Sequence, residues 1–506
     1  MSPAVSLKDR ASIETFPGLS VRYLKENRVL PLRHENGRIL TAMADPTDRE
    51  LSLALEVALG APVVPVAAPA EEILEVIQAV YEPGSPMSRL VGGLEAEEID
   101  LDREETSEIG HLRDMAREAP IIQLVNLLVL RAIQMGASDI HLEPFEDDFR
   151  VRYRQDGILF EAESPPKGLQ AAVLSRLKIM ARLDIAERRL PQDGRFRLKV
   201  QGRDIDFRVS TIPTLLGESM VIRILDREKV ILDLHRLGFP PRELQDFDDL
   251  INKPNGMILV TGPTGSGKTT TLYAALERLN SPEKKIITVE DPVEYRLAGV
   301  TQMQVKPSIG LTFARSLRHI VRQDPEIILV GEIRDRETAE IAVHAALTGH
   351  LVFSTLHTND AAGAITRLLE MGIEDFLLAS AILGILAQRL VRLICPECRE
   401  ALPPQAIVEE LRAANHGRGP LKAPARMFSG QGCPACAHTG YKGRTGIYEL
   451  LRVDDALRQA ILKRADASTL RQLAMQQGMQ TLAEDGWAKV TRGLTTTQEV
   501  LRVTQD

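Results

Sequence analysis

The sequence predicts an α/β protein whose centre is a parallel sheet. Short apolar runs recur along the middle of the chain, each with the length of a buried strand, and a segment with helical spacing lies between the last two. Strands that alternate with helices build a three-layer core with its ligand site at the carboxyl ends of the strands. The predicted strands cover residues 257–260, 286–289, 327–330 and 351–354, and the clearest intervening helix covers 336–347.

A glycine-rich turn follows the first strand. Residues 262–269 fit G-x-x-x-x-G-K-[ST], and residues 272–279 continue as good helix formers, which is the strand, loop and helix order of a P-loop. Backbone amides and a helix N-terminus then face one phosphate. Lys268 adds a positive charge, and the Thr269 hydroxyl is placed to bind Mg²⁺. The predicted nucleoside triphosphate site comprises Gly262, Pro263, Thr264, Gly265, Ser266, Gly267, Lys268, Thr269 and Thr270.

Length and composition predict several domains in a cytosolic protein. At about 150 residues per domain, 506 residues correspond to three or four domains. The first residues lack the apolar stretch of a signal peptide. The longest apolar run, 376–387, is interrupted by Ser380 and followed by Gln388 and Arg389, so it falls short of the roughly 20 residues of a membrane span. The net charge of -8 gives no support to a nucleic-acid partner.

Residues 1–82 are expected to form a small α/β docking module. Strands at 28–32 and 38–43 flank an Asn36-Gly37 hairpin turn, and a third strand is expected at 63–67. Helices are expected at 48–59 and 71–81; a purely structural extension is the alternative to docking. Residues 83–110 form an acidic linker that carries eight acids against the single Arg103 between Glu95 and Glu108. We expect this linker to be flexible, or else to be a solvated helix face.

Residues 111–227 are expected to form an arginine-rich α+β domain, which a linker at 228–241 joins to the core. Helices are expected at 121–135 and 168–183, and strands at 140–142, 148–154 and 158–161. Residues 196–200 and 205–209 alternate apolar and charged side chains, as a hairpin with one polar face does. The arginines either form a solvated face or reach a phosphate bound by a neighbouring subunit. They are Arg150, Arg152, Arg154, Arg195 and Arg208.

Carboxylates and histidines follow the strands of the core, which covers residues 242–394. Glu290 and Glu294 leave the second strand, and Glu332 leaves the third. A carboxylate at such a strand end can hold Mg²⁺ through water or orient the attacking water. His350 and His357 flank the fourth strand, where one of them can sense the γ-phosphate or both can be structural.

All four cysteines fall in two C-x-x-C pairs within residues 395–440. Cys395, Cys398, Cys433 and Cys436 suit a closed tetrahedral Zn²⁺ site, and a reducing compartment favours metal over disulfides. Because the intervening segment is longer than in a usual zinc ribbon, disulfides and free thiols stay as alternatives. Residues 441–506 form a helical region, with helices expected at 456–462, 467–476 and 481–492.

Four ordered motifs resemble the type II/type IV secretion ATPase superfamily over roughly residues 115–500. The resemblance rests on a Walker A motif, an aspartate box, an atypical Walker B motif and a histidine box, together with 183–195 and 208–211. Gly331-Glu332 stands where a generic P-loop enzyme has Asp-Glu, as in the family, whereas Glu326 replaces a frequent aspartate. The four motifs lie at 262–270, 287–295, 327–335 and 348–358.

The resemblance implies a RecA-like ATPase core after a PAS-like α+β domain, in a hexameric ring that hydrolyses ATP to ADP and phosphate. Lys268 and Thr269 would hold the phosphates and Mg²⁺. Glu332 would share metal-water and general-base duties with Glu290 or Glu294. Arg195 and Arg208 would contact nucleotide, and His350 and His357 would couple the γ-phosphate to domain movement. The same tetracysteine insert, expected to hold structural zinc, occurs in the secretion and pilus-assembly branches.

Within the superfamily, the length, the single docking module and the cysteine motif favour the cytoplasmic assembly ATPase of a type II secretion system. Such a protein drives pseudopilus assembly and lies on the cytoplasmic face of the inner membrane. The implied partners are the cytoplasmic domain of the membrane anchor, bound by residues 1–82, and the polytopic platform protein. A type IV pilus extension ATPase is the near alternative. A nucleic-acid translocase is disfavoured by the net charge and by the lack of a basic, aromatic-rich channel. A nucleotide-gated scaffold with little turnover is a further alternative.

Overall fold

The computed structural model describes residues 21–35, 38–59, 61–81, 114–162, 164–200, 202–226, 232–403, 405–407 and 426–505. These residues group into two compact units, one built mainly from residues up to Ile224 and the other mainly from Leu225–Asp506. The predicted linker at 83–110 and the Asn36-Gly37 turn lie outside the described residues. Within the described ranges, no helix is both long and apolar enough to cross a membrane.

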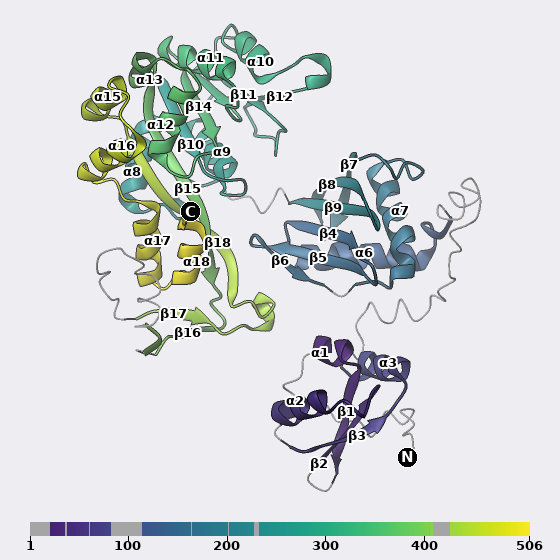
Figure 1. Cartoon of the computed structure of the whole chain (residues 1–506). Helices are drawn as coiled ribbons and strands as arrows, with labels where there is room; N and C mark the ends of the chain where they lie inside the picture. The colour runs from purple at the N-terminus through teal and green to yellow at the C-terminus, as the bar shows by residue number, and fades with distance from the viewer. Residues whose placement is uncertain are drawn as a thin grey trace. The chain divides into compact units, whose positions relative to one another are not determined.

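The N-terminal module is a three-stranded sheet with helices, as predicted (Figure 1). β1 pairs antiparallel with β2, which pairs in parallel with β3. Leu30 from the sheet packs with Leu55, Ile73 and Ile77 from the helices, so the module has its own apolar core. Its elements are α1 (Val21–Glu26), β1 (Val29–Glu35), β2 (Arg38–Met43), α2 (Arg49–Leu59), β3 (Val63–Ala67) and α3 (Ala70–Tyr81). Of these, α1 was not predicted.

The arginine-rich domain is a six-stranded sheet in the order β6-β5-β4-β9-β8-β7. Apolar side chains of α6 and α7, such as Leu128 and Leu177, meet Leu142 and Ile222 of the sheet. The sequence prediction did not include β9, although its buried residues alternate as a half-buried strand requires. The elements are α6 (Ala119–Gln134), β4 (Asp139–Pro144), β5 (Phe149–Gln155), β6 (Ile158–Glu161), α7 (Gln170–Ala181), β7 (Gln192–Val200), β8 (Arg203–Thr214) and β9 (Gly217–Asp226).

The core of the second unit is a seven-stranded sheet in the order β12-β11-β13-β14-β10-β15-β18. Every strand runs parallel to its neighbour except β18, which is antiparallel to β15. The strands are β10 (Gly256–Thr261), β11 (Ile286–Glu290), β12 (Thr301–Gln304), β13 (Ile327–Val330), β14 (Leu351–Leu356), β15 (Ile382–Ile394) and β18 (Tyr441–Arg452). The predicted α/β fold class is confirmed.

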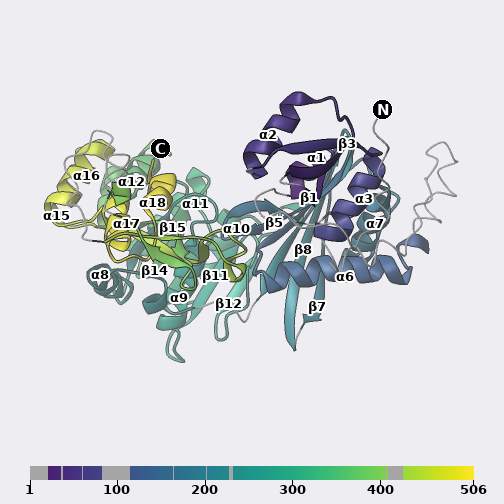
Figure 2. The same ribbon diagram turned by 90° about the horizontal axis from the view of Figure 1, so that it is seen from below.

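Helices cover both faces of this sheet. On β10, Met257 and Leu259 pack into one apolar cluster, whereas Ile258 and Val260 pack into another on the opposite face. A strand buried on both faces reads as a continuous apolar run, which is why these strands were predictable. Figure 2 shows α8 and α9 on one side of the sheet and α11, α12 and α17 (Leu482–Thr491) on the other. The core helices are α8 (Pro241–Ile251), α9 (Lys268–Leu279), α10 (Phe313–Ile320), α11 (Arg336–Leu347), α12 (Ala361–Glu370) and α13 (Asp375–Ala381).

The apolar run at 376–387 is part helix and part strand. α13 ends at Ala381, and β15 begins at the next residue and continues to Ile394, directly before the first cysteine. The run has no clear period, so its sequence did not identify the strand. β15 lies beside β10, the strand that leads into the P-loop.

The described part of the predicted linker at 228–241 packs on the core. Leu234 and Phe239 belong to the same apolar cluster as Ile258 of β10. The Phe239 ring stacks on Tyr448 at 3.7 Å between centroids. The Tyr448 hydroxyl donates to the Leu237 carbonyl at 2.9 Å. Residues 232–240 are therefore part of the core unit, and 227–231 lie outside the described residues.

The prediction of a helical region at 441–506 is wrong for its first residues, because β18 (Tyr441–Arg452) is a strand of the core sheet. The described residues from Asp455 onward are helical, as predicted, with one additional helix. Two short strands, β16 (Arg399–Ala401) and β17 (Phe428–Gly430), pair beside the cysteine region. The unpredicted α18 covers residues that follow a Thr-rich turn, where Thr496 caps its N-terminus. The helices are α15 (Asp455–Leu462), α16 (Ala467–Gln476), α17 (Leu482–Thr491) and α18 (Thr497–Thr504).

Candidate active site

The P-loop connects the end of β10 to the start of α9. Gly267 adopts φ 89°, a left-handed conformation that favours glycine, and α9 begins at the next residue. The Lys268 ammonium donates to the carbonyl oxygens of Gly262 at 2.7 Å and Pro263 at 3.0 Å. Among the described residues, Ser266 has a buried hydroxyl oxygen without a hydrogen-bond partner. A loop with a folded-back lysine and an unpaired buried hydroxyl fits a phosphate ligand.

Lys268 is held in an environment that disfavours its charge. Burial lowers the pKa of Lys268 to about 8; the Glu332 carboxylate opposes this shift, and the Arg389 cation adds to it. Both charges are therefore close enough to act on the lysine. A ligand with negative oxygens would restore the charged form.

Glu332 lies two residues beyond the end of β13, at the carboxyl edge of the sheet. The amide of Gly331 donates to the Val289 carbonyl at 2.8 Å, which carries the β13 pairing past the end of the strand. One Glu332 oxygen lies 2.6 Å from the Arg334 guanidinium, and the other lies 3.5 Å from Nε2 of His357. The Glu332 side chain is 13% exposed. The structure thus brings together Lys268, Glu332 and His357, which were predicted from three separate motifs.

Glu290 is buried at the end of β11 and faces a polar network. Its carboxylate accepts from the Thr288 hydroxyl at 2.5 Å, from the Tyr273 hydroxyl and from the Gln302 amide at 3.3 Å. Burial raises the pKa of Glu290, although these hydrogen bonds oppose the shift. Glu294 is half-buried, and its charge also raises the pKa of Glu290. The structure therefore encloses Glu290 among neighbours on α9 and β12.

The two histidines lie at opposite ends of β14. The His350 ring lies 2.9 Å from the Ala345 carbonyl, and the His350 carbonyl accepts from the amide of Gly256 at the start of β10. His357 follows the last residue of β14. Only His357 shares the edge of the sheet that carries the P-loop.

Arg195 and Arg208 lie on the neighbouring strands β7 and β8 of the arginine-rich domain. Phe196 stacks on Phe207 at 4.6 Å between ring centroids. Since successive side chains of a strand point to opposite faces, both arginines lie on the face opposite these rings. The structure thus places the two predicted arginines on one polar surface.

Two polar residues that the sequence prediction did not assign to the site lie beneath the P-loop. Gln388 on β15 accepts a hydrogen bond from the Thr271 hydroxyl at 2.8 Å, and Arg389 donates to the Asn359 carbonyl at 2.8 Å. Their signal in the sequence is the interruption of an apolar run that ends at Cys395. Without β15 as a strand, that interruption could not be placed next to the P-loop.

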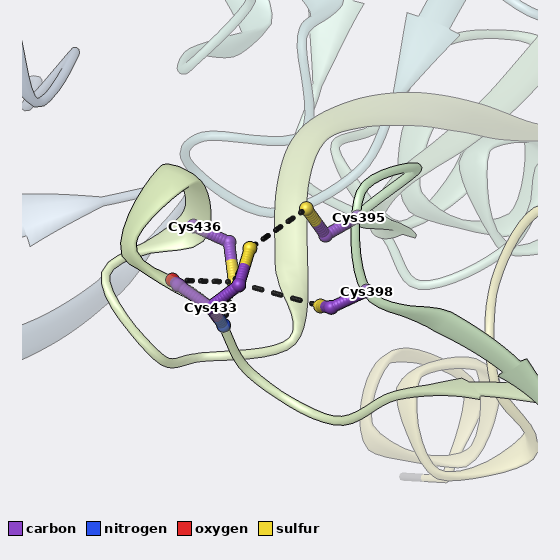
Figure 3. Close-up of side chains that lie close together, drawn as sticks. All are labelled: Cys395, Cys398, Cys433 and Cys436. Atoms are coloured by element: carbon purple, nitrogen blue, oxygen red, sulfur yellow. Dashed lines mark hydrogen bonds between the residues drawn. The ribbon is translucent and has the colours of Figure 1, made fainter.

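The four cysteines gather at the far ends of β15 and β18 (Figure 3). The sulfur atoms of Cys395 and Cys433 lie 3.9 Å apart, as do those of Cys398 and Cys436, and Cys433 and Cys436 are 3.7 Å apart. Four sulfurs at about 2.3 Å from a Zn²⁺ ion would lie about 3.8 Å from one another. The separations exceed the roughly 2.05 Å of a disulfide, so the described cysteines are free thiols that fit a tetrahedral metal site.

Comparisons with known proteins agree with this architecture. Residues 114–502 match the family described as type II/IV secretion system protein, and residues 2–87 match the MshEN domain. The type II secretion system protein E of Xanthomonas campestris pv. campestris is 52% identical over 490 residues, 97% of this chain and 85% of the relative. The type IV pilus assembly ATPase PilB of Myxococcus xanthus is 46% identical over 506 residues, 99% of this chain and 88% of the relative.

A solved structure shares the same fold. The pilus retraction motor PilT with bound ADP superposes with a TM-score of 0.52 at 28% identity, over 75% of this chain and 96% of the motor. Together with the match over residues 114–502, these relatives establish that the chain belongs to the type II/IV secretion system protein family.

Proposed function

We propose that this protein hydrolyses ATP to ADP and phosphate at the P-loop. The observation that carries the proposal is the shared sheet edge, where the Lys268 loop lies close to the Glu332–His357 pair. A phosphate-binding loop beside a strand-end carboxylate suits positioning and activation of an attacking water. The similarity to a solved motor with bound ADP supports the same reading.

The residues divide the work as follows in this proposal. Lys268 exchanges its two carbonyl partners for the β- and γ-phosphates. The Thr269 hydroxyl, with Glu332 acting through water, would supply the oxygen ligands that Mg²⁺ prefers, and the ion would neutralise phosphate charge. Glu332 orients and deprotonates the attacking water, while Glu294 is the second candidate for that role. Glu290 positions α9 through Tyr273.

Arginines of a second copy complete the site in this proposal. Arg195 and Arg208 share one polar strand face and would contact the nucleotide of a neighbouring subunit in a homohexamer. His357 would couple the γ-phosphate to movement between domains. His350, at the other end of β14, would act in that coupling from the start of the strand.

The cellular role we infer is assembly of the pseudopilus in a type II secretion system. The similarity over nearly the whole chain to a type II secretion system protein E supports this role. The protein would lie in the cytoplasm on the inner membrane, with residues 1–82 on the cytoplasmic domain of the membrane anchor and a further contact to the polytopic platform protein. The cysteine cluster would hold a structural Zn²⁺.

Type IV pilus extension is the second candidate, because PilB is 46% identical along the whole chain. A pull-down from membranes with the full-length protein, and with a variant lacking residues 1–82, separates the two. If the full-length protein recovers a secretion-system membrane anchor and the truncated variant does not, the role in type II secretion is favoured. Recovery of a pilus component instead favours the role in pilus extension. Hydrolysis stimulated by DNA would instead point to a nucleic-acid translocase.

The enzymatic proposal is tested with Lys268→Ala. Phosphate release by the wild-type ring and its loss in the variant are expected, because the loop would lose its charge for the phosphates. Turnover retained in Lys268→Ala would contradict the proposed site. Undetectable turnover in the wild type, with partner proteins present, would favour a nucleotide-gated scaffold.

A further inference from the structure

A buried arginine lies directly beside the first glycine of the P-loop. Arg389 is 6% exposed, on the part of β15 that extends past the end of β10. A Cβ atom built on Gly262 would lie 2.5 Å from the Gln388 carbonyl oxygen and 3.1 Å from Nη1 of Arg389. The Arg389 guanidinium and the Gln388 backbone therefore pack against the P-loop at Gly262, where the chain leaves β10.

The same guanidinium reaches the segment that carries His357. Nη2 of Arg389 donates to the carbonyl oxygen of Asn359 at 2.8 Å, two residues beyond His357. Nη1 donates to the carbonyl oxygen of Gln388 at 3.2 Å. One side chain thus spans the two sides of the candidate site, the P-loop on β10 and the histidine segment on β14.

Hydrogen bonds between uncharged groups also hold the segment that follows β14. The Thr358 amide donates to the Thr261 hydroxyl oxygen at 2.9 Å, and the two threonine hydroxyls lie 2.7 Å apart. Asp360 caps α12 by accepting from the Gly363 amide at 2.6 Å. Neutral hydrogen bonds therefore tie the end of β10 to the segment after β14 alongside the contact from Arg389. Burying a charge is costly, so a charged group here calls for a role that a neutral one would not fill.

We propose that Arg389 is a positioning residue that sets the distance between the P-loop and His357, and thereby the placement of His357 on Glu332. The inference rests on the proposed hydrolysis of ATP. Its cation also acts on Lys268, whose lowered pKa it reinforces. Arg389 would act through these residues rather than by contacting the reacting atoms.

The test compares Arg389→Gln, His357→Ala and the double variant in the full-length protein. We expect Arg389→Gln to lower kcat on the order of tenfold, because small misplacements in a site carry losses of that size, with little change in ADP affinity. If Arg389 acts through His357, the double variant should be no slower than His357→Ala. Arg389→Lys, which keeps the charge, should recover part of kcat.

Arg367→Gln is the matched control, since Arg367 is a surface arginine of the same unit, 55% exposed. It should leave kcat unchanged. The inference would be overturned if the double variant lost kcat by the product of the two single losses. It would also be overturned if Arg389→Gln weakened ADP binding as much as it lowered kcat and Arg389→Lys restored neither. A wild-type protein that binds ADP without hydrolysing ATP would overturn the proposed function instead.

Should Arg389→Gln fail to fold, the affinity of the Arg389→Lys protein for ADP is measured against pH. Above about pH 8 Lys268 loses its charge, so the affinity of the wild-type protein for ADP should fall as pH rises. In Arg389→Lys the ADP affinity should fall with pH in the same way, whereas kcat should be lower than in the wild type. Unchanged kcat in a folded Arg389→Lys protein would contradict positioning by the guanidinium.

Discussion

Nε2 of His357 lies 3.5 Å from a carboxylate oxygen of Glu332, although the two residues belong to different motifs and follow different strands. β13 and β14 are parallel neighbours, so their carboxyl ends meet at one edge. The other Glu332 oxygen contacts Arg334 at 2.6 Å. The Arg334 guanidinium therefore orients the carboxylate and the His357 ring lies beside it, which makes Glu332 the best placed of the three acidic candidates to act on water.

The first prediction concerns this carboxylate. Glu332→Gln removes the proton acceptor but keeps the shape and the contact to Arg334. We expect kcat to fall by about 10² or more, within the range for a general base, while ATP affinity stays within a few-fold. Steady-state phosphate release and binding of a fluorescent ATP analogue measure the two effects. A variant with near wild-type kcat would assign the base to another residue.

The second prediction distinguishes Glu290 from Glu332. Glu290 is 3% exposed and accepts from Tyr273 and Thr288. Because Gln retains acceptor capacity at this site, we expect Glu290→Gln to keep at least about tenfold more activity than Glu332→Gln. Tyr273→Phe, which removes a donor to the same carboxylate, should resemble Glu290→Gln. If Glu290→Gln is as inactive as Glu332→Gln, Glu290 takes part in the chemistry.

The parts of the fold and the candidate site that the sequence predicts are those whose sequence pattern is local. The P-loop and the strands β10, β11, β13 and β14 were predictable, because an apolar run followed by a fixed motif carries its own structural context. The proximity of Glu332 and His357 followed from parallel strands ending together. The direction of the Glu290 carboxylate did not, because its partner Gln302 lies on β12, a strand with little apolar signal.

β15 illustrates the same limit for a whole strand. Its 13 residues begin directly after a helix and lack a burial period of two, since 9 of them are buried and the other 4 are partly buried. The position of Arg389 was therefore invisible, although Gln388 and Arg389 were noticeable as polar residues in an apolar run. A pattern shows that a residue is unusual, and only the pairing of strands shows what it touches.

The third prediction concerns the cysteine cluster. We expect one Zn²⁺ per chain by elemental analysis of protein purified without chelator, because the four sulfurs have tetrahedral separations. Cys433→Ser should lower the zinc content and the melting temperature. Cobalt substitution should give thiolate-to-metal absorption. Metal-free protein with unchanged stability would contradict the assignment.

The fourth prediction concerns a buried ion pair within α17, whose carboxylate also accepts a hydrogen bond from β18. Lys489 lies 2.6 Å from both Asp485 oxygens, both side chains are 2% exposed, and Asp485 also accepts from the Tyr448 amide. Lys489→Met leaves an unpaired buried carboxylate, so we expect a loss of about 3–5 kcal/mol. Asp485→Asn combined with Lys489→Met should cost less than the single changes together. Denaturant unfolding followed by fluorescence of Trp487, the single tryptophan and a residue of α17, reports the change.

A simple sum of the two single changes would contradict the ion pair. The exposed pair of Arg367 and Glu370, 3.7 Å apart, is the matched control. Arg367→Met should change the free energy of unfolding by less than about 1 kcal/mol, as surface pairs do.

The last prediction concerns acid stability at the C-terminal helix. Glu499 on α18 accepts from the backbone and side chain of Arg392 and from Arg502. Burial alone would raise the pKa of Glu499, but these charge-assisted hydrogen bonds outweigh it and hold the pKa at about 2, below the ordinary value of 4.5. The folded state thus binds this proton less readily than the unfolded state. The stabilisation is complete above the ordinary pKa and is lost as pH falls toward 2.

Between pH 6 and pH 3 the lost stability should be about 2 kcal/mol from this residue. Glu499→Gln removes the titrating group, so the free energy of unfolding should be lower than wild type at pH 6 and should depend less on pH. Trp487 fluorescence during urea unfolding at several pH values gives both quantities. Glu370→Gln, at a 68% exposed position, controls for loss of a surface carboxylate. If Glu499→Gln loses as much stability as wild type over this range, other carboxylates govern the acid response, and the α18 contact to β15 is not what acid disrupts.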